Sequence, residues 1–299
     1  MASNIEKDAL SGVETTGHEW DGLKELNNPL PKWWLYIFYV CIAWSLVYYV
    51  FYPSWPTGTS YTKGILNWSM REEIVEKLAE AKASQAKYVD RIAKLSVDEI
   101  QQDKDLLNFA MAGGRTMFNE NCAGCHGAGG QGAKGFPTLA DDVWLWGGKT
   151  AEIYQTISGG VRQSTVAETR GTPGVMGMTA FGRDGILTKD QIDQVTDYVL
   201  ALNGKPADAA KAAAGKTVFE ENCTACHGPN AEGSVAAGLD GIGAPPLKTA
   251  NWLYGGDKAT LMATVINGRA GEMPAWSTRL PDTTIKQLAI YVHNLGGGK

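Results

Sequence analysis

The sequence has no excess of basic residues and only a few cysteines. Lys and Arg number 27 against 32 Asp and Glu, which leaves a net charge of -5. Nucleic-acid binding depends on basic side chains that contact phosphates, so this balance argues against a general nucleic-acid binder. Of the five cysteines, Cys41 lies alone in an apolar segment, where a small buried hydrophobe is expected. Any cofactor, metal or disulfide chemistry of cysteine therefore rests on Cys122, Cys125, Cys223 and Cys226.

Charged residues are also absent from Trp33 to Tyr52. At about 1.5 Å per residue, a helix of this length spans a hydrocarbon core of about 30 Å. Trp and Tyr crowd both ends, as at a membrane interface. A cleaved signal peptide is disfavoured, because a long polar segment precedes the run and no small-residue cleavage site follows it. The sequence predicts a retained membrane-spanning helix over 33–52, while the basic residues on its two sides do not decide its orientation.

The residues after this run predict a connector over 53–104. Pro53, Pro56 and Gly58 end the membrane helix. A capping box of Ser69 and Glu72 then predicts an amphipathic helix that continues to about residue 95. Two interpretations of this helix stay open, a docking surface for a partner and a solvated spacer.

From about residue 105 the chain repeats itself. Residues 114–127, GRTMFNENCAGCHG, return as GKTVFEENCTACHG at 215–228. WLWGG at 144–148 returns as WLYGG at 252–256. Each unit closes with a predicted helix. The repeats therefore predict two tandem, mostly helical domains, over 105–204 and 205–299.

The Cys-x-x-Cys-His core of both copies is the attachment signature of c-type haem. Two thiols bond to the macrocycle, and the adjacent His126 or His227 binds its iron. Zinc would need four ligands at one centre, whereas these clusters belong to separate domains. A disulfide leaves the histidines unexplained, and a thioredoxin-like pair does not require a histidine in both copies. The sequence predicts two covalently bound haem c groups.

The sixth iron ligand is predicted from the methionines. Met178 and Met273 occupy matched positions in a Met-x-Ala-aromatic pattern, whereas nearby Met176 matches Gly271. His/Met ligation closes both axial positions and suits electron transfer. Met178 and Met273 are therefore the predicted ligands. Two adjacent domains of this kind can exchange ligand loops, so ligation within each repeat is only the default assignment.

Other residues around the haems have weaker patterns. Carbonyls near Pro137 and Pro245 are candidates to accept the second imidazole proton. Trp144 and Trp252 are candidates to wall the haems, with ordinary core packing as the alternative. Arg162 and Arg269 are candidate partners of the haem propionates. His18 and His293 have no repeat counterpart and are expected at surfaces or interfaces.

The whole chain resembles the CcoP (FixP) family, the dihaem, membrane-anchored subunits of cbb3-type cytochrome c oxidases. The pre-anchor residues HEWDG (18–22), ELNNPLP (25–31) and Trp33-Trp34 carry this resemblance, together with both CxxCH domains and the YVHNLGGG tail (291–298). The implied fold is mainly α, with one N-terminal transmembrane helix followed by two tandem class I cytochrome c domains.

The resemblance implies an electron conduit within an oxidase of the bacterial inner membrane. A c-type cytochrome would donate electrons, which pass through a monohaem subunit to a separate haem-copper subunit that reduces oxygen. A small accessory membrane subunit and association with a bc1 complex are further implied partners, and no nucleic acid is expected. Residues 1–32 would be cytoplasmic and the connector and haem domains periplasmic.

Two other functions remain as alternatives. A free-standing, membrane-anchored electron shuttle would carry the same haems but would not co-purify with an oxidase. A dihaem peroxidase needs one iron open to its substrate, which two matched methionine ligands oppose.

Overall fold

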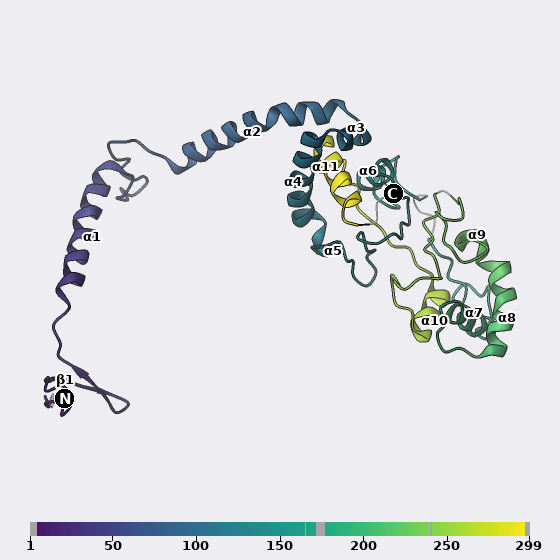
Figure 1. Ribbon diagram of the computed structural model, residues 1–299, viewed down its shortest axis with the longest axis horizontal. Coiled ribbons are helices and arrows are strands. Elements are labelled where there is room, and N and C mark those ends of the chain that lie inside the picture. Colours follow the sequence, from purple (N-terminus) through teal and green to yellow (C-terminus); the bar gives the residue numbers. More distant parts are fainter. Residues whose placement is uncertain (1–4, 165, 172–176, 240, 297–299) are drawn as a thin grey trace. The chain divides into compact units, whose positions relative to one another are not determined.

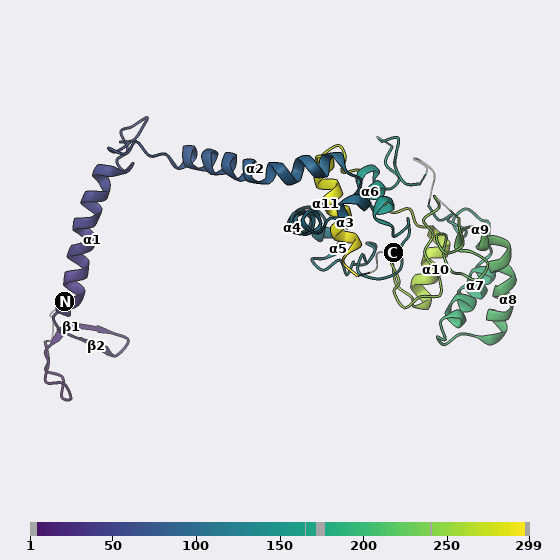
Figure 2. The same ribbon diagram turned by 45° about the horizontal axis from the view of Figure 1, so that its top comes forward.

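The computed structural model describes residues 5–164, 166–171, 177–239 and 241–296. The chain divides into two compact units, residues 1–84 and 85–299, and helices dominate both (Figures 1 and 2). The helices are α1 (Lys32–Phe51), α2 (Met70–Lys94), α3 (Val97–Gln102), α4 (Lys104–Asn121), α5 (Ala123–His126), α6 (Thr150–Gly159), α7 (Lys189–Leu202), α8 (Ala209–Asn222), α9 (Thr224–His227), α10 (Lys258–Asn267) and α11 (Asp282–His293).

The predicted membrane helix is present as α1. It is the one helix of the described residues that is long and apolar enough to cross a membrane. None of its 20 residues, all of which are described, is buried against other parts of the protein. An isolated helix with apolar side chains on all faces is expected for a span in lipid, because hydrocarbon replaces the protein core as its surroundings.

A short β-hairpin precedes α1 and was not predicted. Strand β1 (Thr15–Trp20) pairs antiparallel with β2 (Leu23–Leu26), with Trp20 opposite Leu23. The two turn residues Asp21 and Gly22 both have positive φ, 52° and 84°. This backbone is that of a type I′ turn, which Asp-Gly favours strongly. The Asp-Gly pair was therefore the signal in the sequence that could have identified the hairpin.

The connector helix is confirmed as α2, which begins one residue after Ser69. The last turn of α2 docks within the chain. Ile92 is fully buried together with Ile290 of α11 and residues of α3 and α4. The Lys286 ammonium of α11 also donates to three carbonyls at the end of α2, those of Ile92, Ala93 and Leu95. A lysine there satisfies carbonyls that the helix end leaves free and complements its negative dipole.

Two hydrophobic clusters of the larger unit, called the first and the second core below, each combine residues of both repeats. α4 and α6 of the first repeat pack with α11, the last helix of the second repeat. α8 and α10 of the second repeat pack with α7, the last helix of the first repeat. Figures 1 and 2 both show the yellow α11 against the blue α4, and α7 beside α8 and α10. The two repeats have exchanged their closing segments.

Two short antiparallel bridges form where the exchanged segments cross. Val161, just after α6, pairs with Met273, and Arg269, just after α10, pairs with Met178. Each pair forms two backbone hydrogen bonds, at 2.9 and 3.2 Å and at 2.6 and 3.2 Å. The predicted boundary between 204 and 205 separates the sequence repeats, whereas the first core combines residues from both sides of it.

A shared glycine allows the helices of each core to cross closely. Gly114 of α4 lies against the Gln287 carbonyl of α11, and Gly215 of α8 lies against the Gln194 carbonyl of α7. A Cβ at either glycine would overlap that carbonyl. An aromatic pair seals each crossing, with ring centroids 5.4 Å apart for Phe118 and Tyr291 and 5.3 Å apart for Phe219 and Tyr198.

Candidate haem-binding sites

Each CxxCH motif forms one helical turn at the end of a longer helix. The N–H of His126 donates to the Cys122 carbonyl in α5, and the N–H of His227 donates to the Cys223 carbonyl in α9, both over 2.9 Å. Both turns end at a glycine with positive φ, Gly127 (77°) and Gly228 (79°). In both sites the first cysteine is half-buried in the core and the second is exposed.

The two proximal histidines make the hydrogen bond expected for a haem ligand. Nδ1–H of His126 donates to the Pro137 carbonyl over 2.9 Å, and Nδ1–H of His227 donates to the Pro245 carbonyl over 2.8 Å. These bonds confirm the two predicted proline carbonyls. They leave Nε2 as the nitrogen available for iron and orient each ring. Burial lowers the pKa of both imidazoles, which favours the neutral form that binds metals.

The thiols do not resemble a redox pair. Burial, together with the neighbouring thiol, raises the pKa of Cys122 and of Cys223 to about 11. Reactive Cys-x-x-Cys pairs have lowered pKa values, so this environment is the opposite of a thioredoxin site. All five cysteines belong to the described residues, and none forms a disulfide. The described residues also contain no cluster of three His, Cys, Asp or Glu that would suit zinc.

The segments that carry the two methionines cross between the repeats. Met273 packs against the first core, which includes Cys122 and the α6 residue Ile157. Met178 pairs with Arg269 at the end of α10, and Phe181, three residues later, packs in the second core with Cys223. This arrangement favours ligation across the repeats over the default of ligation within each repeat, and iron ligation by Met178 and Met273 stays a prediction. Met176, weighed as an alternative, lies outside the described residues.

One buried polar atom supports a haem in the second site. Nε1 of Trp252 is buried and has no hydrogen-bond partner among the described residues. Trp252 packs beside α7 and α10, next to Leu247, which also contacts the second core. A buried indole N–H without an acceptor is unfavourable, and a haem propionate is an acceptor of the required kind. Together with the exposed second thiol and the oriented imidazole, the residues present fit a covalent haem.

The two predicted propionate partners lie at the contact between the cores. The Arg162 guanidinium donates to the Gly271 carbonyl over 2.7 Å and lies 5.5 Å from the ring centre of Trp146. Arg269 donates twice to the hydroxyl of Thr264, over 3.1 and 2.9 Å, and lies 4.1 Å from the ring centre of Tyr254. Partial burial lowers the pKa of Arg162. Propionate binding by either arginine stays a prediction.

Trp146 and Tyr254, the aromatic residues beside these arginines, each lie next to the loop of the other core that carries the histidine-binding proline. This contact was not predicted. The Trp146 ring abuts Gly243, which precedes the Pro245 loop, so closely that a Cβ there would overlap it. Across the contact, the N–H of Gly135 donates to the Leu253 carbonyl over 2.7 Å, next to Tyr254. Trp146 and Tyr254 occupy the same position in WLWGG and WLYGG, so their repetition was a signal in the sequence for a shared role.

The two unrepeated histidines lie away from the haem turns. His293 on α11 lies 3.2 Å from the Gln101 amide of α3 through Nδ1, which agrees with the predicted interface role. His18 is a residue of strand β1. Neither belongs to a metal-binding cluster among the described residues.

Three family models match the chain in succession. Residues 12–59 match the N-terminal domain of cytochrome oxidase-cbb3, FixP. Residues 111–203 match cytochrome c, and residues 210–292 match cytochrome C oxidase, cbb3-type, subunit III. The order of the three regions agrees with the membrane helix followed by two cytochrome c repeats.

Curated relatives match over the full length. The chain is 77% identical over 299 residues to the cbb3-type cytochrome c oxidase subunit CcoP of Azospirillum sp. (strain B510), with 100% of both chains covered. It is 72% identical to the CcoP subunit of Azospirillum brasilense, covering 98% of this chain and 99% of the relative. Identity to the FixP subunit of Bradyrhizobium sp. (strain ORS 278) is 48%, with 100% of both covered. The chain belongs to the CcoP/FixP family of cbb3-type cytochrome c oxidase subunits.

Proposed function

We propose that this chain is the electron-entry conduit of its oxidase. It accepts electrons from a c-type cytochrome and passes them, through a monohaem subunit, to the haem-copper subunit that reduces oxygen. The observation that carries this proposal is the pair of matched sites, each with an oriented histidine and a methionine from the crossing segment. A site closed by His and Met suits electron transfer and leaves no open position for oxygen or peroxide.

The ligand sets follow from the exchanged segments. Cys122 and Cys125 would hold the first haem, and His126 and Met273 would bind its iron. Cys223 and Cys226 would hold the second haem, and His227 and Met178 would bind its iron. When bound, the haem irons supply one-electron chemistry. The protein binds and orients them, because each imidazole is held by a proline carbonyl and each methionine segment by a two-bond backbone bridge.

The contact between the cores sets the relative position of the two sites. Trp146 lies against Gly243, beside the loop whose Pro245 carbonyl holds His227, and the N–H of Gly135, beside the Pro137 loop that holds His126, donates to the Leu253 carbonyl. A bond from the Asn251 amide to the Asp141 carboxylate, over 2.8 Å, adds a further link. We propose that electrons cross between the two haems through this contact, because it involves the backbone next to both loops that hold the proximal histidines, His126 and His227.

The proposed location is the bacterial inner membrane. α1 crosses the bilayer once, residues 1–32 lie in the cytoplasm, and the haem domains lie in the periplasm. Its proposed partners are the catalytic haem-copper subunit, the monohaem subunit, a small accessory membrane subunit and a c-type donor. Association with a bc1 complex is a further proposed interaction.

Detergent purification of the tagged chain tests this assignment. Haem b and copper should co-purify, whereas their absence would favour a free-standing shuttle.

The exchanged ligation is tested with one haem at a time. In a Cys223→Ser/Cys226→Ser background only the first haem remains. There Met273→Ala should lower its potential, on the order of a hundred millivolts within the ≈ 0.8 V range that axial ligands cover. It should also let the reduced iron bind carbon monoxide. Met178→Ala in the same background is the matched control and should leave both properties unchanged. The opposite result would establish ligation within each repeat.

A further inference from the structure

The backbone carbonyls at the C-terminal end of the membrane helix accept hydrogen bonds from other groups of the protein. An α-helix leaves its last four carbonyls without partners in the regular ladder, and at a membrane surface water normally satisfies them. The last regular bond of α1 runs from the N–H of Tyr52 to the Tyr48 carbonyl (2.9 Å), and the four carbonyls that follow all have protein donors. The hydroxyl of Ser54 donates to Tyr49 (3.1 Å) and to Tyr52 (3.2 Å), the N–H of Ile65 to Val50 (3.0 Å) and the N–H of Leu66 to Phe51 (3.1 Å).

The chain returns to α1 through a small hairpin. Pro56 and Tyr61 form an antiparallel bridge, and the following residues run back to the helix end. Gly64 allows the closest approach, because its φ of 71° disfavours other residues and a Cβ would overlap the Phe51 carbonyl. The segment 62–66 therefore forms a cap on α1, called the helix cap below.

The helix cap brings apolar side chains to the level of the last turn. Ile65 and Leu66, bonded to Val50 and Phe51, are 71% and 54% exposed. Exposed aliphatic side chains beside a satisfied helix end match the requirement of lipid, in which every backbone polar group needs an internal partner. A surface bathed in water would require neither the satisfied carbonyls nor the apolar side chains.

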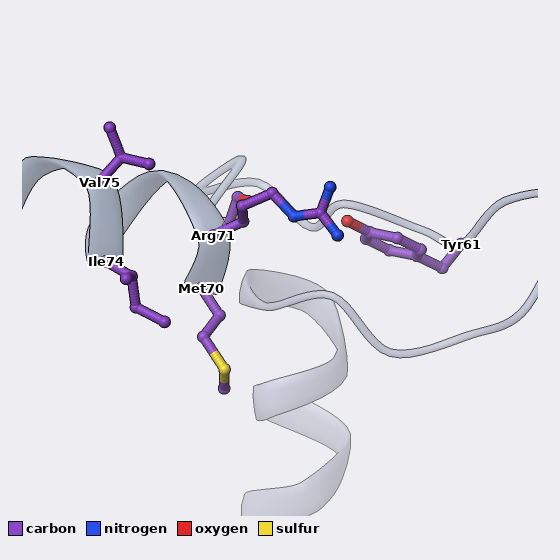
Figure 3. A pocket seen from close by; sticks show the side chains of 6 residues that line it. Tyr61, Met70, Arg71, Ile74 and Val75 are labelled. Carbon is purple, nitrogen blue, oxygen red and sulfur yellow. The ribbon is translucent and has the colours of Figure 1, made fainter. Parts of the chain in front are cut away.

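The start of α2 separates polar from apolar side chains. Figure 3 shows Arg71 reaching toward Tyr61, while Met70 and Ile74 project together to another side of the helix. These residues line a shallow hollow of ≈ 460 Å³. Edge-to-face aromatic contacts also join the loop to the end of α1, with ring centres 5.1 Å apart for Trp55 and Tyr49 and 5.9 Å apart for Trp68 and Tyr52. Trp, Tyr and Arg are typical of the boundary between headgroups and acyl chains.

We propose that the helix cap is a lipid-binding element, with Ile65 and Leu66 inserted among the acyl chains. The embedded surface of this chain would then extend beyond residues 33–52, and the cap would fix the depth at which α1 ends. This inference rests on the membrane span proposed above. The favoured occupant is lipid, since the cap continues the apolar surface of α1 and bonds to its last turn.

Nitroxide labels test the proposal in the full-length chain reconstituted in a lipid nanodisc, with Cys41→Ala removing the cysteine that does not bind haem. Single cysteines are introduced as Ile65→Cys and Leu66→Cys, with Ile42→Cys inside α1 and Ser84→Cys on α2 as references. Collisions with oxygen, which concentrates in lipid, are compared with collisions with a water-soluble nickel chelate. The ratio of oxygen to nickel accessibility at 65 and 66 should approach that at 42 and exceed that at 84 several-fold.

The other outcomes are distinct. A low ratio at 65 and 66 with a high ratio at 42 would overturn the lipid-binding cap while leaving the span intact. Low ratios at all four positions would overturn the span and the cap together. The same labels in the assembled oxidase address a protein partner. Shielding of 65 and 66 from both reagents would mean that another subunit, rather than lipid, covers the cap.

Discussion

The two haem-binding cores have the same framework but differ at one edge. Asp197 of α7 and Ile290 of α11 each precede the tyrosine that packs at the helix crossing. Ile290 is fully buried under Ile92 and Ile100, at the junction of α2 and α3. Asp197 is 1% exposed and accepts two hydrogen bonds from the Lys258 ammonium, over 3.0 and 2.9 Å.

The start of the neighbouring helix differs in the same way. Lys258 is the first residue of α10, and Thr150, in the equivalent place, is the first residue of α6. The hydroxyl of Thr150 donates to the Gln101 side chain of α3, over 3.1 Å. Lys258 instead joins Asp197 and Asp193, and Lys211 also bonds to Asp193. The first core is covered by the connector helices, so apolar Ile290 is suited to its edge. In the second core the ion pairs of Lys258 with Asp197 and Asp193 occupy the equivalent edge.

The origin of the closing helix is the second difference. The elements of the second core run continuously from Met178 to α10, whereas the first core is completed by α11, from the far end of the chain. Repeated sequences with equal haem turns therefore differ in how they depend on the rest of the chain. Damage to the C-terminal segment should affect the haem attached near the N-terminal end of the repeats.

The largest expected effect is that of truncation after Ala270. This truncated chain lacks Met273 and α11, so the first core loses its proposed sixth ligand and its closing helix. The first iron should bind carbon monoxide when reduced, while the second stays six-coordinate, giving about one bound carbon monoxide per chain. Optical titration measures this ratio. Loss of the second site with retention of the first would contradict the exchanged packing.

Substitution of the crossing glycines should have the next largest effect. Gly114→Val should destabilise the first core and Gly215→Val the second, each by about 3 kcal/mol, the upper end for overpacking, because a backbone carbonyl must move. Denaturant unfolding measures the two effects separately in two single-haem backgrounds, Cys223→Ser/Cys226→Ser for the first core and Cys122→Ser/Cys125→Ser for the second. Gly124→Ala is the matched control. A Cβ there meets no atom within 4 Å, and the second copy has Ala225 at this position.

The smallest effect tests the edge of the second core. Lys258→Met leaves the buried Asp197 carboxylate without its ammonium donor. The second core should lose about 1–3 kcal/mol, the cost of a buried polar group without its partner, and the first core should be unchanged. Thermal unfolding of the two single-haem backgrounds distinguishes them. Lys216→Met removes only a surface pair with Glu220 and should change stability by less than about 0.5 kcal/mol. Equal effects of the two substitutions would show that the ion pair does not stabilise the core.

The residues of the haem sites and the membrane helix could be predicted from the sequence alone. The CxxCH spacing predicts the haem turns, because both thiols and the imidazole lie within one helical turn. Proline carbonyls near 137 and 245 and the matched Met-x-Ala-aromatic segments were also identified by repetition. The membrane helix follows from length and hydropathy. Each of these features depends on residues close together in sequence, where bond geometry and helical periodicity restrict the outcome.

The pairing of the two halves depended on tertiary structure. Both repeats have nearly equal closing helices, and either can present an aromatic residue and a backbone carbonyl to the glycine of either opening helix. Hydrophobic periodicity identifies which face of α7 or α11 is buried, but it does not identify the partner helix, since burial of apolar area is not directional. The crossing bridges at Val161–Met273 and Met178–Arg269, together with the α2–α3 cover over Ile290, place α11 on α4 and α7 on α8.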